Sequence, residues 1–300
     1  MAGFSDCIRP NMRRLTSAML ALFLARLRAH PSRTGSLIIT LFGDLIGPRG
    51  GKVWLGTMLE VFRGVEIADG VVRTALSRLA ADGWLERTRK GRNSLYQLTG
   101  QGRVAAMAAE LPIYGSARSE WGGGFHLAML EPGTAREATR QALLTDGFGQ
   151  PLPGLMVAPD TTPMPDHPGV LAMAARLDPK AARALAARSW PLDDLAGRYR
   201  GFLAAFPHDI EPMSDFQALL ARLLLIHEWR RVVLRDPRLP APLLPADWPG
   251  HAARALCARL YPLLVEPSER WLDARDVGVR ADRPVRFLGP DRVTDFSCQS

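Results

Sequence analysis

The sequence contains little cysteine and no recognisable metal-binding spacing. Its three cysteines, Cys7, Cys257 and Cys298, are odd in number and far apart, which excludes a disulfide framework and favours a reducing compartment. No cysteine or histidine falls in a CxxC or HExxH spacing, and His227-Glu228 lacks the second histidine of a metalloprotease motif. We therefore expect no metal, no cofactor and no catalytic residue, which argues against an enzyme.

The sequence also lacks a long hydrophobic run. No segment approaches the roughly 20 apolar residues that span a bilayer. The apolar stretch Leu15–Ala25 follows Arg13 and Arg14, as in a secretory leader, but Arg26 comes next and no small-residue cleavage site is present. Apolar residues in this stretch have helical spacing. The sequence therefore predicts an amphipathic leading helix in a cytoplasmic protein that does not enter a membrane.

Lysine is almost absent, and the positive charge is concentrated at one end. Only Lys52, Lys90 and Lys180 are lysines among 38 cationic residues. Residues 1–110 hold 16 Lys or Arg against 8 Asp or Glu, whereas the remaining 190 residues hold 22 of each. The first segment thus carries the whole net charge of +8. A basic module on a neutral body suggests a polyanionic partner, although arginine bias from codon usage would give the same excess.

Three helices are expected between residues 34 and 83. Ser36 is a possible cap for the first, whose inward residues are Leu37, Ile38, Leu41 and Leu45, and Gly47-Pro48-Arg49-Gly50-Gly51 would end it. Leu55, Met58, Leu59 and Phe62 have the spacing of a second helix. Asp69 could cap a third, with Val72, Ala75, Leu76 and Leu79 inward and Gly83 at its end.

Two short strands joined by a basic turn should follow, over 84–88 and 95–98, with Thr99 capping another helix. Three helices and a basic hairpin are the order of a winged helix. The outward face of the third helix and the hairpin offer donors for base edges and phosphates. We expect duplex DNA contacts from Arg73, Thr74, Ser77, Arg78, Arg87, Arg89, Lys90 and Arg92. Packing is the more common role for Trp54 and Trp84.

The rest of the chain divides into two patterns. Strands over 121–130, 154–159 and 170–177 and helices over 134–146 and 179–188 are compatible with a ferredoxin-like α+β unit. Proline-separated helices are expected over 192–206, 214–236, 249–264 and 267–274. We expect a leading extension (1–34), a winged helix-turn-helix domain (35–111), a central ferredoxin-like domain (112–190), a helical C-terminal domain (191–275) and a tail (276–300).

Several long strings make the sequence resemble one family. They include Ser36–Asp44, Val72–Leu79, Gly91–Thr99, His227–Arg231 and Leu244–Gly250. Over residues 35–272 the chain resembles the PaaX-type repressors of phenylacetic acid catabolism. Near Trp121 the chain has Phe125 where the family pattern has a second tryptophan. An aromatic residue is kept, so the expected fold is unchanged, but the shape of the ligand pocket could differ.

The resemblance implies a transcriptional repressor with a Cas2-like central domain. It implies a homodimer bound to double-stranded operator DNA and released by an aryl-CoA thioester, typically phenylacetyl-CoA. A site for such an effector needs arginines for its phosphates beside aromatic walls. We expect these residue types to be supplied by Trp190, Arg198, Tyr199, Trp229, Arg230, Arg231 and Arg235. Core packing and ion pairs with Glu228 or Asp236 would explain these residues equally well. A CoA-dependent or nuclease-like enzyme, or an RNA-binding protein, remains the alternative.

Overall fold

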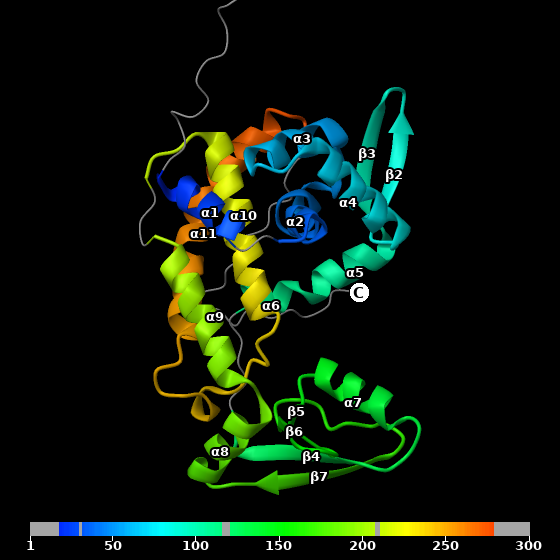
Figure 1. Ribbon diagram of the computed structural model, residues 1–300, viewed down its shortest axis with the longest axis vertical. Coiled ribbons are helices and arrows are strands. Elements are labelled where there is room, and N and C mark those ends of the chain that lie inside the picture. The colour runs from blue at the N-terminus through cyan, green and yellow to red at the C-terminus, as the bar shows by residue number, and fades with distance from the viewer. Residues whose placement is uncertain (1–17, 30–31, 116–120, 208–210, 279–300) are drawn as a thin grey trace, which may run out of the picture. The chain divides into compact units, whose positions relative to one another are not determined.

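A computed structural model describes residues 18–29, 32–115, 121–207 and 211–278 (Figure 1). The protein is α+β, with many helices and two small antiparallel sheets. It contains two compact units. The first takes the described residues of 1–107, 204–228 and 257–285, and the second those of 108–203 and 229–256. Within the described part of the chain, no helix is long and apolar enough to cross a membrane.

The first unit contains a bundle of short helices beside a three-stranded sheet. Its first half comprises α1 (Ala18–Ala29), α2 (Thr34–Thr40), the π-helix η2 (Leu41–Ile46), the 3-10 turn η3 (Gly47–Arg49), β1 (Lys52–Trp54), α3 (Leu55–Gly64), α4 (Asp69–Ala81), β2 (Leu85–Lys90), β3 (Asn93–Leu98) and most of α5 (Gly100–Ala108). The strand order is β1-β3-β2, and both pairs are antiparallel. Most of α10 (Asp215–Val233) and α11 (Gly250–Asp273) completes this unit.

The core of the first unit has the inward residues that the helical periodicity predicts. Leu37, Ile38, Leu41 and Leu45 are at most 1% exposed. On α3, Met58, Leu59 and Phe62 are buried, whereas Leu55 is only half-buried. On α4, Val72 and Leu76 are fully buried, and Ala75 and Leu79 are half-buried at the margins of the same stripe. α2 packs directly against α4.

Two helix starts differ from the prediction. α2 begins at Thr34 after Arg33, so Ser36 lies inside the helix and does not cap it. α4 follows Ala68, and the carboxylate of Asp69 accepts hydrogen bonds from Arg63 instead of from the backbone amides of its own helix. A neighbouring guanidinium therefore outcompetes the local capping geometry. Thr99, in contrast, accepts a hydrogen bond from the Gly102 amide at 3.0 Å, as a capping residue should.

The segment between α2 and α3 contains two features that the pattern did not predict. The first helix continues as a π-helix through Ile46, with Asp44 buried inside it. Lys52–Trp54 then forms a three-residue strand on the outer side of β3. A run of three residues is too short to give a readable alternation. Trp54 and Trp84 are both half-buried.

The second unit contains a four-stranded antiparallel sheet in the order β5-β6-β4-β7. Its elements are α6 (Glu110–Tyr114), β4 (Gly124–Leu130), α7 (Arg136–Thr145), β5 (Gly149–Leu152), β6 (Leu155–Pro159), β7 (Val170–Arg176), α8 (Pro179–Ser189), most of α9 (Leu192–Ala205) and the 3-10 turn η4 (Ala241–Leu243). Leu143 of α7 packs with Ala128, Phe148 and Met156 against one face of the sheet. β5 was not predicted.

The last predicted break is wrong. α11 runs unbroken from Gly250 to Asp273 with Pro262 and Pro267 inside it, although prolines were expected to separate two helices. A proline removes one backbone donor and usually kinks a helix. Here Leu260, Tyr261 and Leu264 are fully buried, so tertiary packing offsets the local penalty.

Candidate nucleic-acid interface

α4 presents one polar face to solvent. Arg73, Thr74, Ser77 and Arg78 are all exposed, and Val72 and Leu76 anchor the opposite side. The hydroxyl of Thr74 donates to the Gly70 carbonyl oxygen at 2.9 Å. Among the described residues, neither guanidinium group has a hydrogen-bond or ion-pair partner, although the Arg73 charge contributes to lowering the Asp69 pKa. Both guanidinium groups are thus available to an external acceptor.

The β2–β3 hairpin carries the remaining cations. Figure 1 shows it beside α4. Arg87, Arg89, Lys90 and Arg92 are exposed around Gly91, whose positive φ of 59° fits the tight turn. Arg87 donates to Ser94 Oγ at 3.0 Å, and Arg89 donates to the Gly91 carbonyl oxygen at 3.2 Å. No described carboxylate pairs with these four side chains.

The turn between α3 and α4 is held by two exposed ion pairs. Arg28 donates to both Glu66 oxygens, at 2.7 and 2.5 Å, and Arg63 donates to both Asp69 oxygens, at 2.8 and 2.5 Å. These hydrogen bonds from arginine lower the pKa of Glu66 and of Asp69. Glu66 has a positive φ of 63°, which a side chain rarely adopts. The ion pair with α1 therefore supports a strained residue that lies three positions before the first residue of α4.

The first unit contains a buried charge network. Arg222 of α10 and Asp44 of η2, each with a side chain 1% exposed, are joined at 2.7 Å. Arg222 also donates to Glu269 at 2.7 Å, and Tyr261 donates to the second Asp44 oxygen at 2.8 Å. Burial opposes the Arg222 charge and lowers its pKa, but Asp44, Tyr261 and Glu269 together outweigh burial and raise the Arg222 pKa well above its usual value. Arg49 extends the network through ion pairs with Glu269 and Asp273.

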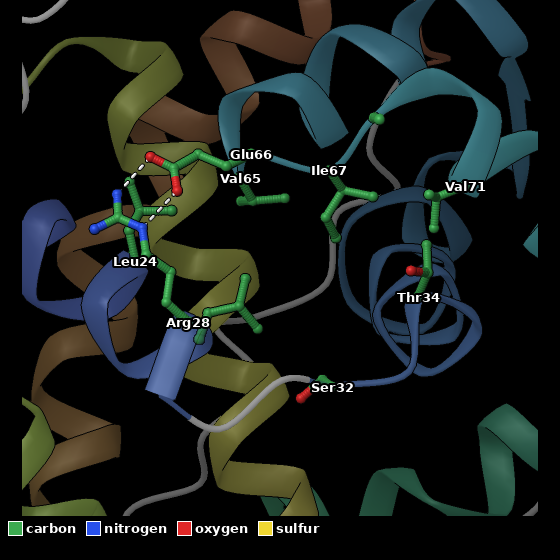
Figure 2. A pocket seen from close by; sticks show the side chains of 10 residues that line it. Leu24, Arg28, Ser32, Thr34, Val65, Glu66, Ile67 and Val71 are labelled. Atoms are coloured by element: carbon green, nitrogen blue, oxygen red, sulfur yellow. Dashed lines mark hydrogen bonds and ion pairs between the residues drawn. The ribbon is translucent and has the colours of Figure 1, made fainter.

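A groove of about 420 Å³ lies between α1 and the start of α4 (Figure 2). It is lined by Leu24, Leu27, Arg28, Ser32, Thr34, Val65, Glu66, Ile67, Ala68 and Val71. Figure 2 shows the Arg28–Glu66 pair at one end and Thr34 and Val71 at the other. A second groove, of about 410 Å³, lies beside β1 and includes Lys52, Trp54 and Leu95.

The aromatic residues predicted to bind the effector lie in the second unit and are buried. Trp190 donates to the Gly147 carbonyl oxygen at 3.2 Å, and Trp229 donates to that of Ile113 at 2.8 Å. Tyr199 donates to Asp236 at 2.6 Å. The Tyr199 and Trp229 rings lie 6.1 Å apart, so these two residues do come together. Neither of the grooves described above includes any of the three.

The predicted effector arginines differ in their exposure and in their partners. Arg198 is exposed and pairs with Asp194 at 3.0 Å, and Arg235 donates to the Arg231 carbonyl oxygen. Arg230 is mostly buried, which lowers its pKa. Glu228 pairs with Arg26, and Asp236 accepts a hydrogen bond from Tyr199. The described residues contain no group of three or more potential metal ligands.

Sequence reasoning did not identify the Asp44–Arg222 pair or the groove. One signal for the pair was present, since each is a charged residue within an apolar run, Leu37–Ile46 and Leu219–Ile226. A charge on a buried helix face usually has a buried partner. The groove gave no signal, because its walls come from separate elements whose relative placement no local pattern encodes.

Comparison with known proteins supports a single family. A PaaX-like protein family model matches residues 33–102, and a PaaX-like protein C-terminal domain model matches residues 190–274. The chain is 35% identical over 256 residues to the transcriptional repressor PaaX of Escherichia coli (strain K12), covering 78% of this chain and 81% of the relative.

A solved structure shares the fold. The uncharacterized protein Rv0674 from Mycobacterium tuberculosis matches 84% of this chain and 97% of its own with a TM-score of 0.52 and 21% identity. The sequence identity with the Escherichia coli repressor extends over most of both chains and indicates common descent. Together with the two family models, it shows that the chain belongs to the PaaX family.

Proposed function

We propose that this chain is a transcriptional repressor that inserts α4 into the major groove of duplex DNA. The observation that carries the proposal is the exposed face of α4. There the guanidinium groups of Arg73 and Arg78 have no hydrogen-bond or ion-pair partner among the described residues, and the buried side chains of Val72 and Leu76 hold the opposite side of the helix. Arginine can bind guanine O6 and N7 with two hydrogen bonds. A basic helix face seated on a rigid core is suited to this readout.

The arrangement around α4 supports a winged helix. The chain order α2-β1-α3-α4-β2-β3, with sheet order β1-β3-β2, places the hairpin directly after the proposed recognition helix. Arg87, Arg89, Lys90 and Arg92 would bind phosphates or the adjacent minor groove. The relative from Escherichia coli is named a transcriptional repressor, which supports a regulator over an enzyme. Through the family, we infer that the target genes serve phenylacetic acid catabolism.

Loss of one arginine tests the DNA contact. Arg78→Ala should weaken binding to the promoter fragment beside this gene by about 1–3 kcal/mol and relax its base preference at one position. Arg198→Ala, at an exposed arginine of α9, is the matched control and should leave the affinity unchanged. A gel shift with substituted fragments measures both. If Arg78→Ala and the wild type had equal affinity and base preference, Arg78 would not be one of the residues that contact DNA bases.

We further propose that the repressor acts as a homodimer through the second sheet. Met129 of β4 and Leu171 and Met173 of β7 are 48%, 54% and 36% exposed, and Met129 pairs with Leu171 across the two strands. They lie on the face opposite the one that α7 covers. β7 is an edge strand, so no further strand of this sheet lies beyond it. A second copy of the chain, related by a two-fold axis, could therefore pack against this apolar face.

One apolar-to-charged substitution tests the dimer. Leu171→Asp should give a monomer in sedimentation equilibrium, whereas Leu152→Asp, at a residue 50% exposed on β5, should leave the dimer intact. The monomer should also lose operator affinity, because two half-sites about 34 Å apart bind two recognition helices together. A stable dimer of Leu171→Asp would place the interface elsewhere.

The proposed effector is an aryl-CoA, with phenylacetyl-CoA as the first candidate. The residues proposed to bind it are those predicted from the sequence. Packing of Tyr199 against Trp229 supports an aromatic wall, whereas Arg198 forms an ion pair with Asp194. Effector binding would favour a dimer geometry that no longer matches the half-site spacing. Titrating the repressor–operator complex with phenylacetyl-CoA should release DNA at stoichiometric effector. Hydrolysis of the thioester by the pure protein would favour the enzyme alternative.

The second sheet is compatible with the predicted ferredoxin-like domain, with one difference. Its elements follow the order β4-α7-β5-β6-β7-α8, so a loop takes the place of the second crossover helix and α8 follows the last strand. The predicted division into winged helix, central domain and helical C-terminal domain remains our interpretation. The predicted tail, 276–300, lies outside the described residues beyond Gly278.

A further inference from the structure

The groove between α1 and the start of α4 has the size and chemistry of a small-molecule site. Its volume of about 420 Å³ lies within the range of ligand pockets. An apolar cavity of about 150 Å³ can already hold benzene. The space here therefore suffices for one aromatic ring with a short side chain.

The lining indicates an uncharged ligand. Six of the ten lining residues are apolar: Leu24, Leu27, Val65, Ile67, Ala68 and Val71. The groove's one cation and one anion, Arg28 and Glu66, form a bidentate pair with each other. A charged ligand would have to break that pair or lie beside apolar groups without a counter-ion, both of which are unfavourable. Thr34 offers a hydroxyl group for a short polar arm.

The position of the groove ties it to α4. Ala68 precedes α4 and Val71 lies in its first turn, two residues before Arg73. Val71 is 51% exposed although it is a large apolar residue beside the helix core. The opposite wall is α1, which is anchored independently by Phe23 against Phe206 and by Arg26 to Glu228 at 3.0 Å. A ligand between these walls would press on the first turn of α4.

We propose that this groove binds an uncharged aromatic molecule with a short polar side chain, and that occupancy displaces the start of α4. The site is separate from the predicted effector residues of the second unit. The binding itself does not depend on the proposed function. Its consequence, weaker DNA binding, does rest on α4 being the recognition helix.

Fluorine NMR with two probes tests the binding. 4-Fluorophenylacetamide should give a saturable shift with the full-length wild type, and 4-fluorophenylacetate should bind several-fold more weakly. Val71→Phe should fill the groove and abolish the shift. Val104→Phe, at a residue 69% exposed on α5 and outside the groove, should keep it. No saturable shift with the wild type, equal binding of amide and carboxylate, or unchanged binding to Val71→Phe would overturn the proposal.

A gel shift tests the consequence separately. At saturating amide, operator affinity of the wild type should fall about 5-fold or more, the usual lower range of coupling between sites. Val71→Phe, with a native circular dichroism melt, should show no response to the amide. Bound amide with unchanged operator affinity would overturn the displacement of α4. If the protein without amide bound no operator, the proposed function would fail, and the NMR result would still decide the site.

Discussion

Replacing Asp44 by Asn should destabilise the protein far more than its conservative chemistry suggests. The substitution keeps the shape but leaves the Arg222 guanidinium, 1% exposed, facing a neutral amide. Removing one partner of a buried ion pair costs about 3–5 kcal/mol. Because Arg222 keeps its 2.7 Å hydrogen bond to Glu269, we expect the lower end, about 3 kcal/mol.

Urea unfolding followed by circular dichroism measures this loss. The double variant Asp44→Asn/Arg222→Met should be more stable than the sum of its single variants predicts, by about 1–3 kcal/mol, since it no longer buries an arginine that has lost one of its two carboxylate partners. Asp194→Asn, at the exposed pair with Arg198, is the control and should cost less than about 0.5 kcal/mol. A loss below about 1 kcal/mol for Asp44→Asn, or strict additivity of the cycle, would refute the argument.

Three further outcomes are expected. Arg89→Ala should weaken binding to all DNA sequences alike and reduce the slope of log K against log salt by about 0.9, so an unchanged slope would exclude a phosphate contact. Gly149→Ala should destabilise by about 1–3 kcal/mol, because a Cβ would lie 2.6 Å from Trp190, whereas Gly43→Ala, with no atom within 4 Å, should be nearly neutral in thermal melts. The hydrogen bonds from Arg275 lower the pKa of Glu60 below 4.5, so the stability advantage of the wild type over Glu60→Gln should be present above pH 4.5 and fade as the pH falls further.

Local periodicity was sufficient to find the helices around the candidate interface. The stripes on α2, α3 and α4 were readable because each helix buries one face, and Val72 and Leu76 are indeed fully buried. The basic hairpin was readable from Gly91 between two short alternating runs. Features that depend on tertiary packing could not be predicted from the local sequence pattern. α11 continues through Pro262 and Pro267 because its apolar face is buried, which overrides the local rule.

The side-chain partners were less predictable than the elements. Asp69 has the composition of a capping residue, yet it binds Arg63, six residues earlier. Glu228 and Arg26 are 202 residues apart, so no spacing argument could pair them. The residues expected to face DNA were easier to find, because an exposed cation on a helix with a known buried stripe needs no partner within the protein. Whether they bind DNA remains for the Arg78→Ala experiment.

The cations of α4 and the hairpin are arginines except for Lys90, and residues 69–98 contain no histidine. In this proposed contact surface, lysine is the residue type that acetylation can neutralise, whereas arginine keeps its charge. Acetylation could neutralise only one of its six positive side chains. If this surface binds DNA as proposed, lysine modification would leave most of its charge in place, and we expect an effector to release DNA by moving the surface.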